Sequence, residues 1–183
     1  MTINNNFSDI TYNRKSIRVY DENVKISHEE MLEMIQKATI APSSVNMQPW
    51  RFVVVESPEE KQKLKPLIRF NTRQNDTSSA MILIFGDMEC YEYGEDIYNQ
   101  AVTEGKMSPE VRDQQLAAII PYYKNFTRAE MNDVVKIDSS LAAMQLMLVA
   151  RSHGYDTNPI GGFEADQLAE AFVKFQEEKE ADL

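Results

Sequence analysis

A short basic segment near the start of the chain carries residue types that bind phosphate. Residues 14–18 read Arg-Lys-Ser-Ile-Arg, which places three cations and a hydroxyl within five positions. In an extended backbone alternate side chains point the same way, so Arg14, Ser16 and Arg18 would share one side. Arginine and lysine give charge-assisted hydrogen bonds to phosphate oxygens, and serine adds a neutral one. The segment is a candidate anion site, although short basic clusters are also common as solvated surface turns.

A second candidate is the stiff polar loop over residues 41–49. Pro42 and Pro49 fix the backbone φ angle and remove two hydrogen-bond donors. Short hydrogen-bonding side chains are concentrated between them, at Ser43, Ser44, Asn46 and Gln48. A rigid loop with several such groups suits a planar polar ligand. An ordinary connection, in which the serines and the asparagine serve turn formation, is an equally good interpretation.

The third candidate is a glycine loop near the end of the chain. Residues 158–163 read Asn-Pro-Ile-Gly-Gly-Phe. Two adjacent glycines after a rigid proline let the backbone approach a flat ligand and present its N–H groups. A tight loop between two helices would explain the same residues. A polar run at 71–74, Asn-Thr-Arg-Gln, precedes a predicted strand.

Helices and strands predicted from hydrophobic periodicity connect these segments. Apolar runs predict strands at 52–55 and 81–85, the second buried on both faces of its sheet. Helix-start signals and 3.6-residue periodicity predict helices at 8–13, from Ser27 to before Pro42, and at 58–68, 91–104, 109–120, 127–152 and 166–176.

Two of the predicted helices carry features with consequences for packing. Ser27–Glu30 and Thr127–Glu130 have the spacing of capping boxes, and Pro121 is expected to kink or break its helix. The longest helix is apolar nearly all round over residues 141–149. Such a helix is buried, either in the core or against a partner chain.

Length and composition limit the possible classes of protein. The 183 residues are enough for one domain with a sizeable core. A net charge of −10 argues against non-specific binding to nucleic acid or to anionic membranes. The single cysteine, Cys90, excludes an intramolecular disulfide and indicates a reducing compartment. We expect a cytoplasmic protein without signal peptide or membrane span.

The chain has few side chains suited to difficult chemistry. It contains two histidines and one cysteine, and it lacks a Gly-x-Gly-x-x-Gly fingerprint, a phosphate-binding P-loop and metal-ligand spacing. Neither a catalytic triad nor a metal site is expected. Cys90 is interpreted as a small buried hydrophobic residue. A bound cofactor would supply the reactive groups that these side chains lack.

Taken together and in order, the three candidate segments resemble the signatures of the nitroreductase-like, FMN-dependent NAD(P)H oxidoreductases. The resemblance covers residues 7–172. It implies an α+β fold with a central, mostly antiparallel sheet, flanking helices and a long buried central helix. It also implies an intertwined homodimer with two FMN sites at the interface. The implied activity is reduction of nitroaromatics, quinones or related small-molecule acceptors, with NADH or NADPH as cosubstrate.

The resemblance also assigns residues to the cofactor. The family segment that holds the FMN phosphate and the polar edge of the ring matches the basic segment: Arg14, Lys15, Ser16 and Arg18. The loop that reaches the flavin from the other subunit matches Pro42, Ser43, Ser44 and Asn46. Positions beside the ring and the nicotinamide match Asn71 and Gln74. The loop whose backbone N–H meets flavin N5 matches Pro159, Ile160, Gly161 and Gly162. Hydride would pass through N5 in a ping-pong reaction, with no catalytic side chain.

The end of the chain departs from the family pattern. The family continues with an apolar strand and an extension that crosses to the partner, whereas residues 177–183 read Glu-Glu-Lys-Glu-Ala-Asp-Leu. We therefore expect one domain over 1–183 without that strand and extension. A shortened family member that binds FMN weakly, or only dimerises, is the alternative function. Specialised flavin chemistry such as reductive dehalogenation is a third possibility.

Overall fold

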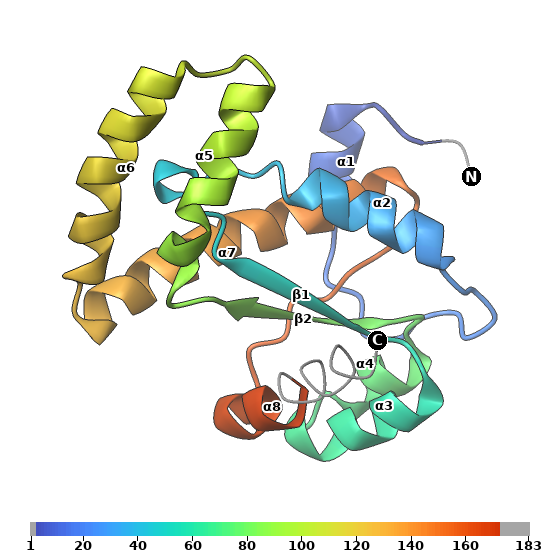
Figure 1. The fold of residues 1–183 in the computed structure, drawn as a ribbon. Coiled ribbons are helices and arrows are strands. Elements are labelled where there is room, and N and C mark those ends of the chain that lie inside the picture. Colours follow the sequence, from blue (N-terminus) through green and yellow to red (C-terminus); the bar gives the residue numbers. More distant parts are fainter. Residues whose placement is uncertain (1–2, 173–183) are drawn as a thin grey trace. The chain divides into compact units, whose positions relative to one another are not determined.

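The computed structural model describes residues 3–172, which form helices and a small sheet (Figure 1). The elements are α1 (Phe7–Asn13), α2 (His28–Ala38), β1 (Trp50–Val55), α3 (Pro58–Leu64), α4 (Thr72–Thr77), β2 (Met81–Gly86), α5 (Gly94–Thr103), α6 (Pro109–Lys124), α7 (Arg128–Ser152) and α8 (Ala165–Phe172). Short 3₁₀ turns lie at Ser44–Asn46, Lys65–Leu67 and Cys90–Tyr93. The α+β class is confirmed. Within residues 3–172, no helix is long and apolar enough to cross a bilayer.

The two strands pair in antiparallel fashion. The Asp87 amide, just beyond β2, donates to the Pro49 carbonyl, just before β1, at 2.7 Å. Both strands lie where the sequence predicts them, but the expected burial of β2 on both faces is wrong, since its side chains are only partly buried. Among the described residues the sheet has two strands, so each strand has a neighbour along one edge only.

The chain divides into two compact units, each with its own apolar core. Among the described residues, the first unit comprises 3–36, 52–85 and 146–172, and the second comprises 37–51 and 86–145. The core of the first unit joins strand, α3 and α8 side chains: Val55, Leu64, Ile68, Leu168 and Phe172. The single domain over 1–183 stays a prediction, and its C-terminal features, like the helix end predicted at 173–176, lie outside the described residues.

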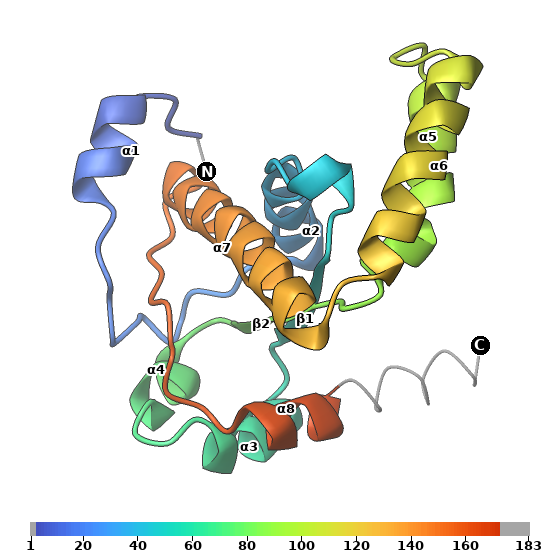
Figure 2. The ribbon, with the colours of Figure 1, turned by 90° about the vertical axis from the view of Figure 1, so that its left-hand side faces the viewer.

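The core of the second unit contains Met47 of the polar loop together with side chains of α5, α6 and α7. α5 and α6 lie side by side (Figures 1 and 2). The buried core residues are Met47, Cys90, Tyr98, Tyr123, Met131 and Val135. Cys90 is fully buried, as predicted, and burial raises the pKa of its thiol to about 11. The thiolate needed for reactivity is therefore scarce at neutral pH.

Most of the local helix signals act as the sequence predicts. The Ser57 hydroxyl caps α3 by accepting from the Glu60 amide at 3.2 Å. Thr127 and Glu130 form a reciprocal capping box, with the Thr127 amide donating to Glu130 Oε2 at 2.8 Å. Pro121 does not break its helix, because α6 continues through it to Lys124. It lies in the last turn, where its missing N–H removes a single helical bond.

α7 is not buried all round within the chain. Its buried side includes Ala142, Leu146 and Ala150. A second face exposes Ile137, Leu141 and Met144, which are 62%, 43% and 42% exposed. Their spacing of four and three residues places them on one face of the helix. Of the two predicted alternatives, burial in the core does not apply to this face, and the stripe of these three residues is a surface that a second chain could cover.

Glu30 shows how a distant contact replaces a predicted local one. Ser27 caps α2 by accepting from the Glu30 amide at 3.2 Å, which is half of the expected capping box. The Glu30 side chain instead accepts from the Tyr155 hydroxyl at 2.7 Å and contacts His153 Nδ1 at 3.2 Å. These bonds, from Tyr155 first and then from His153, lower the pKa of Glu30. The network fastens α2 to the segment that follows α7.

Tyr155→Phe is expected to lower the free energy of unfolding by about 1–2 kcal/mol at pH 7, because a hydrogen bond to a partly exposed carboxylate is lost. Since the folded-state pKa of Glu30 is below its ordinary value of 4.5, this stabilisation is present above that pH. It is lost as the pH falls through the folded-state value. Urea unfolding at pH 7 and at acid pH measures both effects. Tyr20→Phe is the control, since its hydroxyl donates to the neutral Ile17 carbonyl. Equal, pH-independent losses in both variants would contradict the prediction.

Candidate functional site

The structure brings the basic segment and the glycine loop together in the first unit. Ser16 and Thr157 form an isolated parallel β-bridge, and the Ile17 amide donates to the Thr157 carbonyl at 3.1 Å. Residues separated by some 140 positions in the sequence therefore run side by side. The sequence predicts each segment but not this pairing, because a single bridge leaves no periodic pattern.

The cations of the basic segment are available to an anion. The Arg14 side chain is partly buried, whereas Lys15 and Arg18 are exposed. Within residues 3–172, none of these three side chains has a hydrogen-bond or ion-pair partner. Three such cations on a chain of net charge −10 make a local positive site.

Asn71 ties the start of α4 to the glycine loop. Its Nδ2 donates to the carbonyls of Ile68 and Gly162, both at 3.0 Å. Its Oδ1 accepts from Gln74 Nε2 at 3.2 Å, and both amide side chains are buried. Asn71 therefore lies next to Gly162 of the glycine loop, and Gln74 is linked to that loop through Asn71.

The two glycines of the loop differ in their surroundings. A Cβ at Gly162 would lie 3.2 Å from Asn71 Nδ2, so this glycine permits a close approach within the chain. A Cβ at Gly161 would meet nothing within 4 Å, and Gly161 does not have a positive φ. Neither a left-handed backbone nor a close neighbour within the chain therefore requires a glycine at position 161. The loop is open at this point.

Gly162→Ala is expected to destabilise the fold by about 1 kcal/mol, because Asn71 Nδ2 is held by two carbonyls and has little room to move. Gly161→Ala is the matched control and is expected to change stability by less than about 0.5 kcal/mol. Thermal unfolding of both variants measures the difference. Equal stabilities would show that Asn71 adapts to the extra methyl group.

A further tie between these segments was not predicted. Arg69, with a positive φ of 51°, donates from Nε to Glu164 Oε1 at 2.7 Å. The Glu164 amide donates to the Leu67 carbonyl at 2.8 Å. Phe70, between Arg69 and Asn71, is 83% exposed. No sequence signal links Arg69 with Glu164, which lie 95 positions apart.

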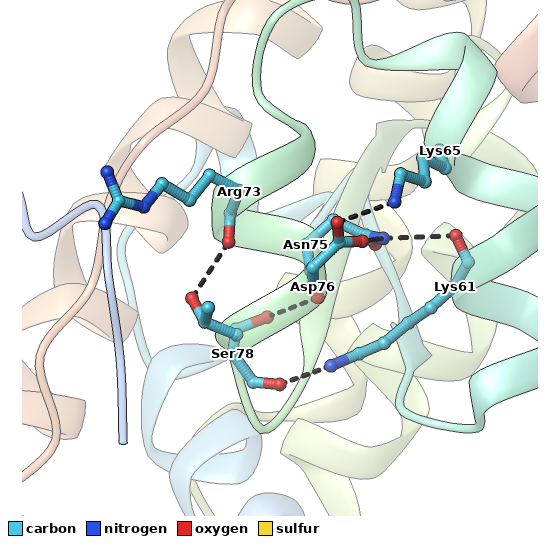
Figure 3. Close-up of polar contacts among 7 residues, drawn as sticks. Lys61, Lys65, Arg73, Asn75, Asp76 and Ser78 are labelled. Atoms are coloured by element: carbon cyan, nitrogen blue, oxygen red, sulfur yellow. Dashed lines mark hydrogen bonds and ion pairs between the residues drawn. The ribbon is translucent and has the colours of Figure 1, made fainter. Parts of the chain in front are cut away.

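Helix α4, which begins next to Asn71, is also held against α3 by polar contacts (Figure 3). Lys65 Nζ pairs with Asp76 Oδ2 at 2.6 Å, and Asn75 Nδ2 donates to the Lys61 carbonyl at 3.2 Å. Lys61 donates to the Ser78 carbonyl, and burial lowers the pKa of its ammonium group. Arg73 extends away from these contacts (Figure 3). The cluster fixes the helix that carries Asn71 and Gln74.

The remaining predicted site residues belong to the second unit. Pro42, Ser44 and Asn46 are exposed, and Ser43 is partly buried. The backbone between them is strained, because Val45, Asn46 and Gln48 have φ angles of 43°, 59° and 47°. Left-handed conformations are unusual outside glycine, and most unusual for a β-branched residue such as valine. Pro42 and Pro49 led to the prediction of a rigid loop, but they gave no sign of these left-handed residues.

Sequence reasoning missed Asp138, which holds this loop from α7. Its Oδ2 accepts from the Ser44 amide at 2.9 Å, and the residue is only 4% exposed. Burial raises the pKa of its carboxyl group, although the Ser44 amide opposes that effect. The available signal was a carboxylate that two serines separate from the apolar helical stretch at 141–149.

A family model places the chain among known proteins. The model of the Nitroreductase family matches residues 11–174. The chain belongs to the nitroreductase family. Within it, "Putative NAD(P)H nitroreductase YdgI" of Bacillus subtilis is 52% identical over 168 residues, covering 92% of this chain and 80% of that protein. The "CLA biosynthesis enone reductase" of Lactiplantibacillus plantarum is 40% identical, covering 91% of this chain and 77% of that enzyme.

Solved structures show that this nitroreductase-family chain has the fold of its relatives. A "putative NAD(P)H:FMN oxidoreductase" from Staphylococcus epidermidis matches with a TM-score of 0.91 and 56% identity, over 93% of this chain and 80% of that one. A "putative nitroreductase in complex with FMN" from Exiguobacterium sibiricum also matches with a TM-score of 0.91, at 55% identity, over 94% of this chain and 83% of that one. The nitroreductase-like fold predicted from the sequence is confirmed.

Proposed function

We propose that the protein is an FMN-dependent oxidoreductase that uses NADH or NADPH to reduce nitroaromatics, quinones or related acceptors. The observation that carries the proposal is the convergence of three separated segments in one unit. Ser16 pairs with Thr157, and Asn71 binds the Gly162 carbonyl. FMN in the Exiguobacterium relative and enone reduction in the Lactiplantibacillus relative support the cofactor and the acceptor class.

The residues of this unit fit FMN. The phosphate needs positive charge, and Arg14, Lys15 and Arg18 have no hydrogen-bond or ion-pair partner in the part of the chain that the structure describes. The flat ring needs open backbone, and a Cβ at Gly161 would meet nothing within 4 Å. Charge and open space therefore occur on neighbouring segments, as a phosphorylated planar cofactor requires.

Each segment then has a role in holding the cofactor. The phosphate and the polar ring edge would be bound by the basic segment: Arg14, Lys15, Ser16 and Arg18. Arg18 would stabilise the negative charge of the reduced ring. Asn71, which binds the Gly162 carbonyl, and Gln74, which binds Asn71, would lie beside the ring. The 159–162 loop (Pro159, Ile160, Gly161 and Gly162) would offer the Gly161 amide to N5. Bound FMN would supply the redox chemistry, which is hydride transfer between NAD(P)H and the acceptor in a ping-pong reaction. The protein contributes orientation and electrostatics.

We further propose that the working form is a homodimer. The exposed stripe Ile137, Leu141 and Met144 provides an apolar surface for a two-fold contact. In such a dimer the loop carrying Pro42, Ser43, Ser44 and Asn46 reaches the flavin of the other subunit. Its exposed, rigid backbone suits that role.

Turnover tests the function. FMN-loaded protein should oxidise NADH or NADPH faster when a quinone, a nitroaromatic or an enone is added, with parallel lines in double-reciprocal plots, the pattern of ping-pong kinetics. Free FMN at equal concentration is the control. FMN-loaded protein that oxidises neither nucleotide above that control would favour the alternative, a family member that binds flavin or dimerises without turnover.

Gly161→Val separates orientation from binding. A Cβ at this position would meet nothing within 4 Å, so we expect the variant to fold normally. The added side chain would cover the open backbone next to the ring, and we expect the rate of flavin reduction by NAD(P)H to fall about tenfold or more, equivalent to about 1.4 kcal/mol in the barrier. FMN affinity should fall less. Stopped-flow bleaching of the flavin band, with protein saturated in FMN, measures the rate. A rate within about twofold of wild type, a barrier change of about 0.4 kcal/mol, would mean that Gly161 does not make the N5 contact.

A further inference from the structure

The loop over residues 43–48 has a backbone that its sequence does not favour. Three of its six residues, Val45, Asn46 and Gln48, have left-handed φ angles, and none of the six is glycine. Such conformations persist only where surrounding structure over-determines them, and they occur most often at functional sites. Ser44, Val45 and Asn46 are exposed, so burial of their side chains does not enforce the conformation.

Three buried side chains from three helices hold this loop. Asp138 of α7 accepts from the Ser44 amide at 2.9 Å. Tyr123 of α6 donates to the Ser44 hydroxyl at 2.6 Å, and Tyr98 of α5 donates to the Val45 carbonyl at 3.0 Å. All three are at most 5% exposed. The hydrogen bonds therefore converge on two adjacent residues at the point where the backbone turns left-handed.

The stability of the fold alone does not explain why these side chains are polar. Burial disfavours the charged form of Asp138, and it raises the pKa of its carboxyl group and of both phenols. An apolar residue at the same place in α7 would avoid the burial of a carboxyl group. At neutral pH both tyrosines stay protonated and remain donors. A buried polar clamp beneath an exposed, strained loop indicates that the loop conformation itself is needed.

We propose that Asp138 and Tyr123 are positioning residues that hold Ser44 in place for contact with the FMN of the partner subunit. This inference rests on the proposed function. Ser44 is fixed at both its amide and its hydroxyl, so it meets the cofactor without a loss of freedom on binding. One subunit thereby sets part of the geometry of its partner's flavin site through residues that touch no flavin.

Four variants test this role. Asp138→Leu removes the acceptor, whereas Asp138→Asn keeps an oxygen that can accept from the Ser44 amide. Tyr123→Phe removes the hydroxyl, and Tyr122→Phe is the matched control on the exposed neighbouring ring. The measurements are the FMN dissociation constant by fluorescence titration and hydrogen exchange of the Ser44 amide in flavin-free protein. Tyr123→Phe keeps the test decisive if Asp138→Leu fails to fold.

We expect Asp138→Leu and Tyr123→Phe to raise the FMN dissociation constant by about tenfold, the worth of one lost hydrogen bond of ordinary strength. The Ser44 amide should exchange faster in Asp138→Leu. Asp138→Asn should recover most of both losses, and Tyr122→Phe should match wild type. Folded Asp138→Leu or Tyr123→Phe protein with wild-type FMN affinity would overturn the inference alone. Wild-type protein that binds no FMN would overturn the proposed function and this inference with it.

Discussion

Leu141→Glu is expected to run as a monomer at micromolar concentration, where we expect wild-type protein to run as a dimer. Leu141 is the middle member of the apolar stripe that α7 exposes with Ile137 and Met144. In a two-fold contact the substitution occurs twice, and each carboxylate would lose water without gaining a partner. We expect the dimer dissociation constant to rise by at least about 1000-fold, which corresponds to about 4 kcal/mol.

Light scattering coupled to gel filtration measures the mass of both proteins. Val111→Glu is the matched control, because Val111 is 41% exposed on α6, outside the stripe, and the added charge is the same. The control should stay dimeric. A monomeric wild-type protein, or a Leu141→Glu variant that remains dimeric, would show that the stripe is not a two-fold interface.

Arg14→Ala and Arg18→Ala are each expected to weaken FMN binding by about 1.5–3 kcal/mol, the usual worth of a hydrogen bond to a charged group. In dissociation constants this is an increase of roughly 10- to 150-fold. In the described part of the chain neither guanidinium is engaged by a carboxylate, so each can turn to a phosphate without breaking an ion pair. Because both would act on the same cofactor, the double variant need not show additive losses.

Fluorescence titration with FMN at two salt concentrations measures these affinities. The losses should be smaller at high salt, since screening weakens partly exposed charge pairs. Lys25→Ala, which removes an exposed cation from the same unit, should leave affinity unchanged. If both arginine variants bind FMN like wild type, the phosphate lies elsewhere.

Local features of the fold were predictable because they depend on neighbouring residues. Ser57 and Thr127 cap helices where the sequence places them, and the two apolar runs form the strands. Predictions failed where distant residues compete with local ones. Glu30 leaves its capping box for Tyr155, more than 120 positions away.

The candidate site was predictable as segments but not as an assembled structure. Residue types and the family resemblance located the basic segment, the polar loop and the glycine loop. Nothing in the spacing indicates that Arg69 pairs with Glu164 or that Asp138 reaches Ser44 across 94 positions. The left-handed backbone at Val45 was equally hidden, because valine is among the residues that least favour it. Contacts of this kind depend on the folded arrangement of whole elements.

The visible spectrum of the purified protein tests the proposed function most directly. The protein should be incubated with FMN, separated from free cofactor by gel filtration and then titrated anaerobically with NADH and with NADPH. We expect a retained flavin band in amounts comparable to the protein chain, which at least one of the two nucleotides bleaches. Protein that retains no flavin after this treatment, or whose bound flavin neither nucleotide reduces, would contradict the assignment of the chain as an FMN-dependent NAD(P)H oxidoreductase.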